Sequence, residues 1–147
     1  MKLVFELVSL AKNLVEVVTK IRSADREGCV RAADFLKKVA ECLGNLGEAY
    51  RSNDHFGLSR FCGELKMYGY ELERILPSYL EKERAQQIHR QWRRTLDIPG
   101  QLVIFIKRPN SWMEYDDLTE EDIQAALHQL EEAIGQFRAC ANILQTR

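Results

Sequence analysis

The sequence lacks the short motifs that mark most catalytic and cofactor-binding sites. It contains neither a glycine-rich phosphate loop nor an HExxH pair. Its four cysteines form no CxxC pair, and no histidine lies at metal-ligand spacing from them. The three histidines also stand at no recognised catalytic spacing from a cysteine or an acidic residue. We therefore predict no catalytic activity, no metal and no bound cofactor, and no small-molecule substrate is evident.

Three further absences limit where the chain acts. The sequence has no excess of positive charge, since its net charge is -1, so nucleic acid is not an expected partner. The apolar N-terminus has no cleavage site of small residues, so no signal peptide is predicted. Five charges in that segment exclude an ordinary membrane span: Lys2, Glu6, Lys12, Glu16 and Lys20. We expect a cytoplasmic protein.

What the sequence does contain is typical of one ordinary globular domain. Apolar residues make up 46% of the 147 and charged residues 29%, which suffices for a core but leaves too little length for two domains. We expect a single domain over 1–147. The cysteines are interpreted as small buried apolar residues in a reducing compartment, with a disulfide as the alternative: Cys29, Cys42, Cys62 and Cys140.

The N-terminal segment has the pattern of a helix with an unusually wide apolar face. One stripe advances in steps of four and three: Leu3, Leu7, Leu10, Leu14, Val17 and Ile21. A second stripe runs beside it: Val4, Val8, Ala11, Val15 and Val18. Two adjacent stripes cover more surface than a coiled-coil seam needs, so we expect this helix to pack against several neighbours at once.

Similar spacing predicts the remaining helices. A second helix is expected from Cys29 to Tyr50, and a turn follows at residues 52–54. A third helix is expected from Leu58 to Ile75, where Pro77 stops or kinks it. A fourth segment, from Ser78 to about Leu96, carries a thin apolar stripe. It is either an extension of the third helix beyond a kink or a separate helix. The last helix is expected from Ile123 to Leu144.

One stretch departs from this helical pattern. Asp97 to Leu118 contains two of the three prolines and the apolar run Leu102 to Ile106, which is typical of a short extended segment. Because no partner strand is visible elsewhere, we expect an extended loop packed on the bundle rather than a sheet. The predicted fold is therefore all-α: a four- to five-helix antiparallel bundle with one extended loop near 97–118.

Charge is distributed unevenly in the second half of the chain. A basic segment interleaved with tryptophans contains Arg84, Arg90, Trp92, Arg93, Arg94, Lys107, Arg108 and Trp112. An acidic cluster follows and includes Asp116, Asp117, Glu120 and Glu121. Basic and aromatic residues together are typical of a surface that meets an anionic membrane. Opposed patches on one molecule also permit head-to-tail self-association. The simplest interpretation remains that both clusters are solvated faces of the bundle.

Three stretches of the sequence resemble a known kind of helical domain. The stretches are RAADFLKKVAECLGNLGEAYRSND (Arg31 to Asp54), CGELKMYGYELERILP (Cys62 to Pro77) and EKERAQQI (Glu81 to Ile88). The matching motifs are Ala33-Asp34-Phe35, Ala40-Glu41-Cys42-Leu43 and the Cys62-x-Glu64-Leu65-x-x-Tyr68 pattern. They resemble N-terminal helical domains of bacterial, often cyanobacterial, multidomain proteins of conflict and cell-death systems. Such domains look like effector-associated modules, and some analogous bundles are grouped with HeLo-like membrane-permeabilising domains.

The resemblance covers about half the chain and implies a helical module without transferable site residues. This sequence departs from it before the third helix, where a Pro-His pair is usual and NDHFGLSRF stands instead. The implied function is a non-catalytic interaction or oligomerisation module of bacterial immune or cell-death signalling, which binds a protein partner or itself.

The alternative function is a HeLo-like executioner that acts on anionic membranes. It would be recruited to the inner membrane on activation and would act through its N-terminal amphipathic helix. The candidate membrane-active residues are Leu3, Val4, Leu7, Val8, Leu10, Leu14, Val15 and Val18.

Overall fold

A computed structural model describes residues 12–14, 17, 20, 26–78, 80–95 and 120–146 of the chain. Helices account for 94% of these residues, and no strand occurs among them. The predicted all-α fold is confirmed. The predicted extended loop near 97–118 lies outside the described residues.

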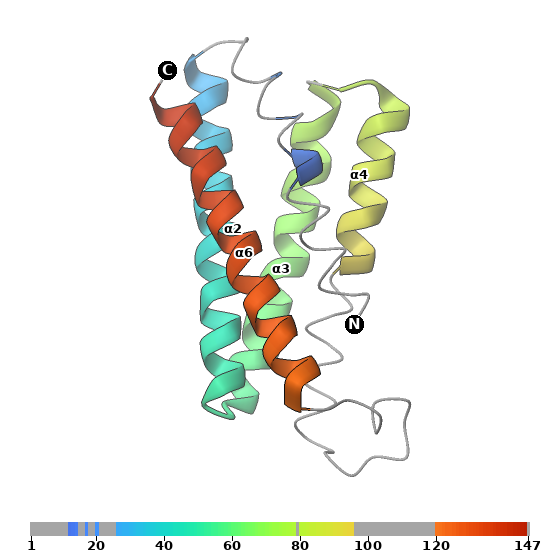
Figure 1. Cartoon of the computed structure of the whole chain (residues 1–147). Helices are drawn as coiled ribbons and strands as arrows, with labels where there is room; N and C mark the ends of the chain where they lie inside the picture. The colour runs from blue at the N-terminus through green and yellow to red at the C-terminus, as the bar shows by residue number, and fades with distance from the viewer. Residues whose placement is uncertain are drawn as a thin grey trace.

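The helices form an antiparallel bundle (Figure 1). In chain order the elements are α2 (Arg26–Arg51), α3 (His55–Ile75), the 3-10 helix η1 (Leu76–Ser78), α4 (Lys82–Thr95) and α6 (Glu120–Gln145). Helix α2 contacts both α3 and α6. The next helix, α4, contacts α3 and η1 and lies at an edge of the bundle.

The chain reverses direction between α2 and α3 in a short turn that satisfies both helix ends. Asn53 adopts the left-handed conformation with φ 55°, which asparagine tolerates better than most residues. The amides of Asn53 and Asp54 then donate to the carbonyls of Tyr50 (3.2 Å) and Ala49 (2.8 Å), the two bonds of a Schellman motif. The Asp54 side chain accepts from the Gly57 amide at 2.9 Å and caps α3.

A second reversal, after α3, separates α4 from it. Pro77 lies within η1, so the α-helix ends at Ile75 and one tight turn follows. The chain then starts α4 at Lys82, and α4 runs antiparallel to α3. The fourth segment is therefore an independent helix rather than a kinked continuation of α3, and it begins four residues later than Ser78.

The core gathers around α2, of whose 26 residues 13 are buried. Gly47 marks the close approach of α2 to α6, since a Cβ there would lie 3.2 Å from a methyl group of Leu130. Near the other end of α2, Phe35 makes an edge-on contact with Tyr68 of α3, at 6.3 Å between ring centroids. The ring of Phe35 also lies 6.2 Å from that of Trp92 of α4. Phe35 therefore links three helices.

The described residues of the N-terminal segment are helical and join this core. Leu14 and Val17 are buried against apolar side chains of α2 and α3. The residues around them are Ala32, Phe35, Leu36, Leu72 and Ile75. The expected packing of the N-terminal helix against several neighbours is confirmed for these two residues.

Candidate interaction surface

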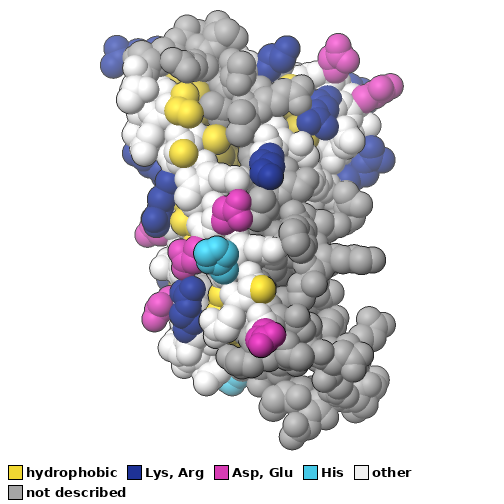
Figure 2. Space-filling view, viewed as in Figure 1, with side chains coloured by type: hydrophobic (Ala, Val, Ile, Leu, Met, Phe, Trp, Pro, Cys, Tyr) yellow, Lys and Arg dark blue, Asp and Glu magenta, His cyan; other side chains and the backbone are white. Residues whose placement is uncertain are grey.

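The edge helix α4 divides into an apolar face and a basic face. Ala85, Ile88 and Trp92 are buried and recur at helical spacing, so they share the side that meets α3. Lys82, Arg90 and Arg93 are exposed on the other side. We call these three residues the basic face. Figure 2 shows Lys and Arg side chains over α4, with acidic side chains near the end where the helix begins.

Trp92 does not belong to the surface, and the prediction that placed it there is wrong. It is 2% exposed and packs on Phe35 of α2 and on Gly69 of α3. Its indole N–H is buried without a hydrogen-bond partner among the described atoms. The physical reason is helical periodicity, since position 92 is four residues after Ile88 and faces the core with it.

Arg84 is half-buried and takes part in holding the N-terminal segment. Its guanidinium donates to Gln87 at 2.8 Å and makes a longer contact of 3.5 Å with the side-chain oxygen of Asn13. The amide of Asn13 in turn donates to Gln91 at 2.6 Å. Both the nitrogen and the oxygen of the Asn13 side-chain amide therefore contact α4. Because Arg84 makes one of these contacts, it is only partly available to a partner.

Arg90 and Arg93 are the predicted basic residues that the structure shows as exposed. Neither forms an ion pair with a residue that the structure describes. Both lie toward the C-terminal end of α4, where the helix dipole favours cations. Arg94 belongs to α4, but its side chain is outside the described part. Lys107, Arg108 and Trp112 lie outside the described residues.

The acidic cluster is described only at the start of α6. Glu121 is exposed in the first turn of that helix, where the dipole favours a carboxylate. Glu120 begins the helix, but its side chain is not described, and Asp116 and Asp117 lie outside the described residues. Figure 1 shows the first turn of α6 near the bottom of the bundle, away from α4 at the right-hand edge. The described parts of the two patches therefore occupy separate surfaces.

Of the eight residues predicted for a membrane-active helix, the structure describes Leu14. Its side chain is 3% exposed and belongs to the core. Leu3, Val4, Leu7, Val8, Leu10, Val15 and Val18 lie outside the described residues. Within the part of the chain that is described, no helix combines the length and the apolar character that crossing a membrane requires.

The four cysteines are free thiols, as expected, and three of them are buried. The Cys42 thiol of α2 donates to the Phe61 carbonyl of α3 at 3.4 Å. Burial, reinforced by Glu64, raises the pKa of Cys42 to about 12, and burial raises that of Cys62 to about 11. Burial also raises the pKa of Cys140. Thiols held protonated in this way are weak nucleophiles at neutral pH.

The histidines are dispersed over three helices. His128 is exposed on α6, whereas His55 and His89 are half-buried on α3 and α4. His89 lies 3.7 Å from Glu73 of α3, a contact that is ionic only when the imidazole is protonated. Among the described residues no group of three or more His, Cys, Asp or Glu side chains is arranged to hold a metal ion.

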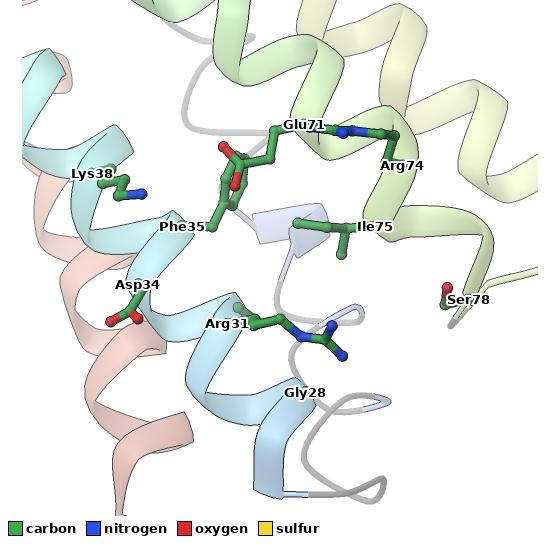
Figure 3. A pocket seen from close by; sticks show the side chains of 10 residues that line it. Gly28, Arg31, Asp34, Phe35, Lys38, Glu71, Arg74, Ile75 and Ser78 are labelled. Carbon is green, nitrogen blue, oxygen red and sulfur yellow. The ribbon is translucent and has the colours of Figure 1, made fainter.

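An open groove lies between α2 and α3 (Figure 3). The sequence patterns do not predict it. It has a volume of about 510 Å³ and a floor that includes Ala32, Phe35 and Ile75. Its rim is charged with both signs: Arg31, Asp34, Lys38, Glu71 and Arg74. On α2 the three rim residues are spaced i, i+3 and i+7, the one signal in the sequence that places them on a common side. A mixed rim around an apolar floor offers contacts to a polypeptide segment but aligns no nucleophile with a base.

Comparison with the models of known protein families, with curated proteins and with solved structures finds no match to this chain.

Proposed function

We propose that this chain is a non-catalytic helical interaction module that self-associates or binds a protein partner through the basic face of α4. The observation that carries the proposal is an edge helix with two exposed arginines, Arg90 and Arg93, that pair with no described residue. The cellular setting we propose is bacterial immune or cell-death signalling in the cytoplasm. The support for that setting is the resemblance carried by the motifs of α2 and α3.

The basic face contributes little to the fold itself. Within α4, Ala85, Ile88 and Trp92 supply the buried contacts. Exposed cations that take no part in packing are free to steer and orient a partner, because complementary charge acts mainly on encounter rate and specificity. The acidic residues at the start of α6 carry the opposite charge, as attraction to the basic face requires. Contact between the basic face of one copy and the acidic cluster of the next would be head-to-tail and could extend into an assembly.

The test is a charge reversal with a matched control. Arg90→Glu combined with Arg93→Glu should weaken self-association roughly tenfold or more, because like charges would then face each other. Sedimentation velocity over a range of protein concentrations measures this. The control is Lys37→Glu with Arg138→Glu, which makes the same change in net charge at exposed sites on α2 and α6. Circular dichroism verifies that both variants keep their helices.

Rescue identifies the complementary surface. Reversal of Asp116, Asp117 and Glu121 to Arg in the same chain should restore the association that the Arg90 and Arg93 reversals remove. If the control pair weakens association as much as the α4 pair does, net charge alone is responsible and the proposal fails. If association is lost and no rescue occurs, a partner other than the acidic cluster meets the basic face.

The second candidate is a membrane-permeabilising bundle of the HeLo-like type. One observation favours it: the helix that carries the basic face also holds the N-terminal segment, through the contacts of Arg84 and Gln91 with Asn13. Binding of α4 to an anionic surface would thus act on the same contacts that keep the N-terminal segment in place. Leu14 and Val17, however, are core residues, so this function requires their release from the core.

A further inference from the structure

A stripe of exposed residues runs the length of α3 on the side opposite to the core. Its members advance in steps of four and three, which keeps them on one helical face: Phe56, Arg60, Gly63, Met67, Tyr70 and Arg74. Phe56 is 90% exposed, and Met67 and Tyr70 are each 64% exposed. We call these six residues the α3 stripe. Three of the five large hydrophobic residues exposed in the described part of the chain belong to it.

The fold does not account for this stripe. The core side of α3 is supplied by Leu58, Leu65 and Leu72, which are spaced seven residues apart and are fully or almost fully buried. Gly63 lies mid-helix, and apart from its own helix backbone nothing that the structure describes lies within 4 Å of where its Cβ would be, so no described neighbour requires a glycine there. Glycine weakens a helix interior, and large apolar side chains gain nothing from solvent. These choices are explained if another surface covers the stripe.

The stripe is complementary to a second copy of itself when the two helices run antiparallel. The pairing follows when the two-fold axis crosses the helices at the height of residue 65, although the Leu65 side chain itself faces the core. Met67 of each copy then meets the space beside Gly63 of the other. Arg60, whose guanidinium lies 5.0 Å from the centroid of the Phe61 ring and pairs with Glu64 in its own chain, then meets Tyr70 of the other copy, and Arg74 meets Phe56. A guanidinium against an aromatic ring stabilises such a contact. A parallel pairing would instead set Arg60 against Arg60 and Arg74 against Arg74. The sequence therefore selects the antiparallel arrangement.

We propose that two copies of this chain associate symmetrically through the α3 stripe, with the helices antiparallel about Leu65. The contact is isologous, so it closes at a dimer, whereas contact through the α4 basic face extends head-to-tail. This contact is independent of the basic face and can fail while the proposed function stands. From Phe56 to Arg74 the stripe is about 27 Å long and roughly 10 Å wide. That is less than the roughly 800 Å² per partner of a stable complex, so the dimer is weak and reversible.

Charges beside the stripe give this dimer a distinctive dependence on salt. Lys66 and Glu64 flank the two-fold axis on opposite sides. Glu64 is paired with Arg60 of its own chain at 3.7 Å, whereas Lys66 lies near its own counterpart from the other copy. Salt screens the repulsion between the two Lys66 side chains, and raising it from about 0.1 M to about 1 M shortens the Debye length from about 10 Å to about 3 Å. The α3 dimer should therefore strengthen at high salt. Association through the α4 basic face should weaken under the same change.

The experiment compares two glycine substitutions by sedimentation velocity at both salt concentrations. Gly63→Glu fills the space that Met67 of the other copy would occupy and sets a carboxylate against that apolar side chain, so it should weaken the dimer roughly tenfold or more. Gly135→Glu is the matched control, because Gly135 is exposed, mid-helix on α6 and likewise free of neighbours. The control should dimerise like the wild type. Both substitutions replace glycine by a better helix former, so neither should impair folding.

Cross-linking tests the orientation. In the antiparallel arrangement Lys66→Cys places one thiol of each copy beside the axis, and a short thiol-reactive cross-linker should yield a covalently linked dimer. Lys37→Cys, at an exposed site on α2, should not cross-link above the level of the wild type with its native thiols. The Arg90→Glu, Arg93→Glu background should leave the Lys66→Cys cross-link intact. A wild-type chain that stays monomeric at both salt concentrations, or a Gly63→Glu dimer as strong as that of Gly135→Glu, would overturn the proposal.

Discussion

At position 69 the α3 backbone and the Trp92 indole leave no room for a side chain. A Cβ on Gly69 would lie 2.7 Å from the indole nitrogen and 2.8 Å from its neighbouring carbon, and the ring is buried. Gly69→Ala should therefore force Trp92 to shift and lower the free energy of unfolding by about 1–3 kcal/mol. Urea denaturation measures the loss. Gly135→Ala, made where space is open, should be neutral or stabilising, and an equal loss in both variants would contradict this packing.

The buried thiol of Cys42 links stability to alkaline pH. Its pKa is raised from 9.0 to about 12, so above pH 9 the unfolded chain releases a proton that the folded chain retains. The free energy of unfolding should therefore fall as pH rises from 9 toward 12, and below pH 9 this contribution is fully present. Cys42→Ala should flatten that decline, as seen in denaturant melts across the range. An unchanged slope would mean that Cys42 titrates normally in the folded state.

Individual residues are also where sequence reasoning erred. The charge run groups Trp92 with its arginine neighbours, whereas its spacing from Ile88 places it inside. The same run includes Arg84, although Arg84 reaches Asn13, 71 positions earlier. No linear pattern announces that contact, because it depends on how the N-terminal segment packs. The charge run correctly predicts the exposure of Arg90 and Arg93.

At the scale of elements, apolar spacing located most helices to within a few residues. The polar run Ser52 to Asp54 predicts where α2 ends and α3 begins. Its side chains and the left-handed Asn53 supply partners for the backbone groups that these two helix ends leave unpaired. The fate of the chain after Pro77 did not follow, since proline ends a helix without fixing the direction of the next. The groove between α2 and α3 was equally hidden, because it depends on the spacing of two helices rather than on either one.

The apolar stripes predicted for the first and last helices can be tested by shortening single side chains to Ala. Leu14 and Leu130 are buried in the N-terminal segment and in α6, respectively. Replacing either by Ala should lower the free energy of unfolding by about 2–5 kcal/mol, through lost apolar contact and the cavity left behind. Ile143→Ala provides the comparison, because Ile143 is 42% exposed on α6 and should change stability by less than about 0.5 kcal/mol. A loss at Leu14 as small as that at Ile143 would show that the N-terminal segment is not part of the folded core.

On the scale of the whole molecule, the bundle presents two proposed association surfaces on neighbouring helices, with opposite expected responses to salt. Association through the basic face of α4 would depend on charge attraction, whereas association through the α3 stripe would depend on apolar and aromatic contact. Together they would join copies through one closed and one open contact, so dimers could be linked into longer assemblies. Such a combination suits a signalling module whose assembly state is controlled by partners.

The same arrangement decides what the resting protein should do at a membrane. Leu14 and Val17 lie among Phe35, Leu36 and Leu72, so inserting them into lipid would first require breaking that packing and the contact of Asn13 with Gln91. The exposed arginines remain available to lipid headgroups, each contributing about 1 kcal/mol near an anionic surface. We therefore expect weak binding of the folded protein to anionic vesicles, reduced by the Arg90→Glu, Arg93→Glu pair, without release of an enclosed dye. A vesicle pull-down and a dye-leakage assay measure the two effects separately.

Leakage by the wild-type protein would reverse this conclusion, provided that it depends on the N-terminal segment. Leu14→Glu should then abolish the leakage, while Ile143→Glu, which adds the same charge at an exposed site on α6, should preserve it. Because Leu14 is also a core residue, circular dichroism and a urea melt must show that Leu14→Glu is still folded under the assay conditions. If a folded Leu14→Glu chain no longer causes dye leakage from the vesicles, membrane permeabilisation through the N-terminal segment would be established. Leakage that both variants retain would arise elsewhere in the molecule, since insertion of an apolar helix through Leu14 cannot tolerate a carboxylate at that position.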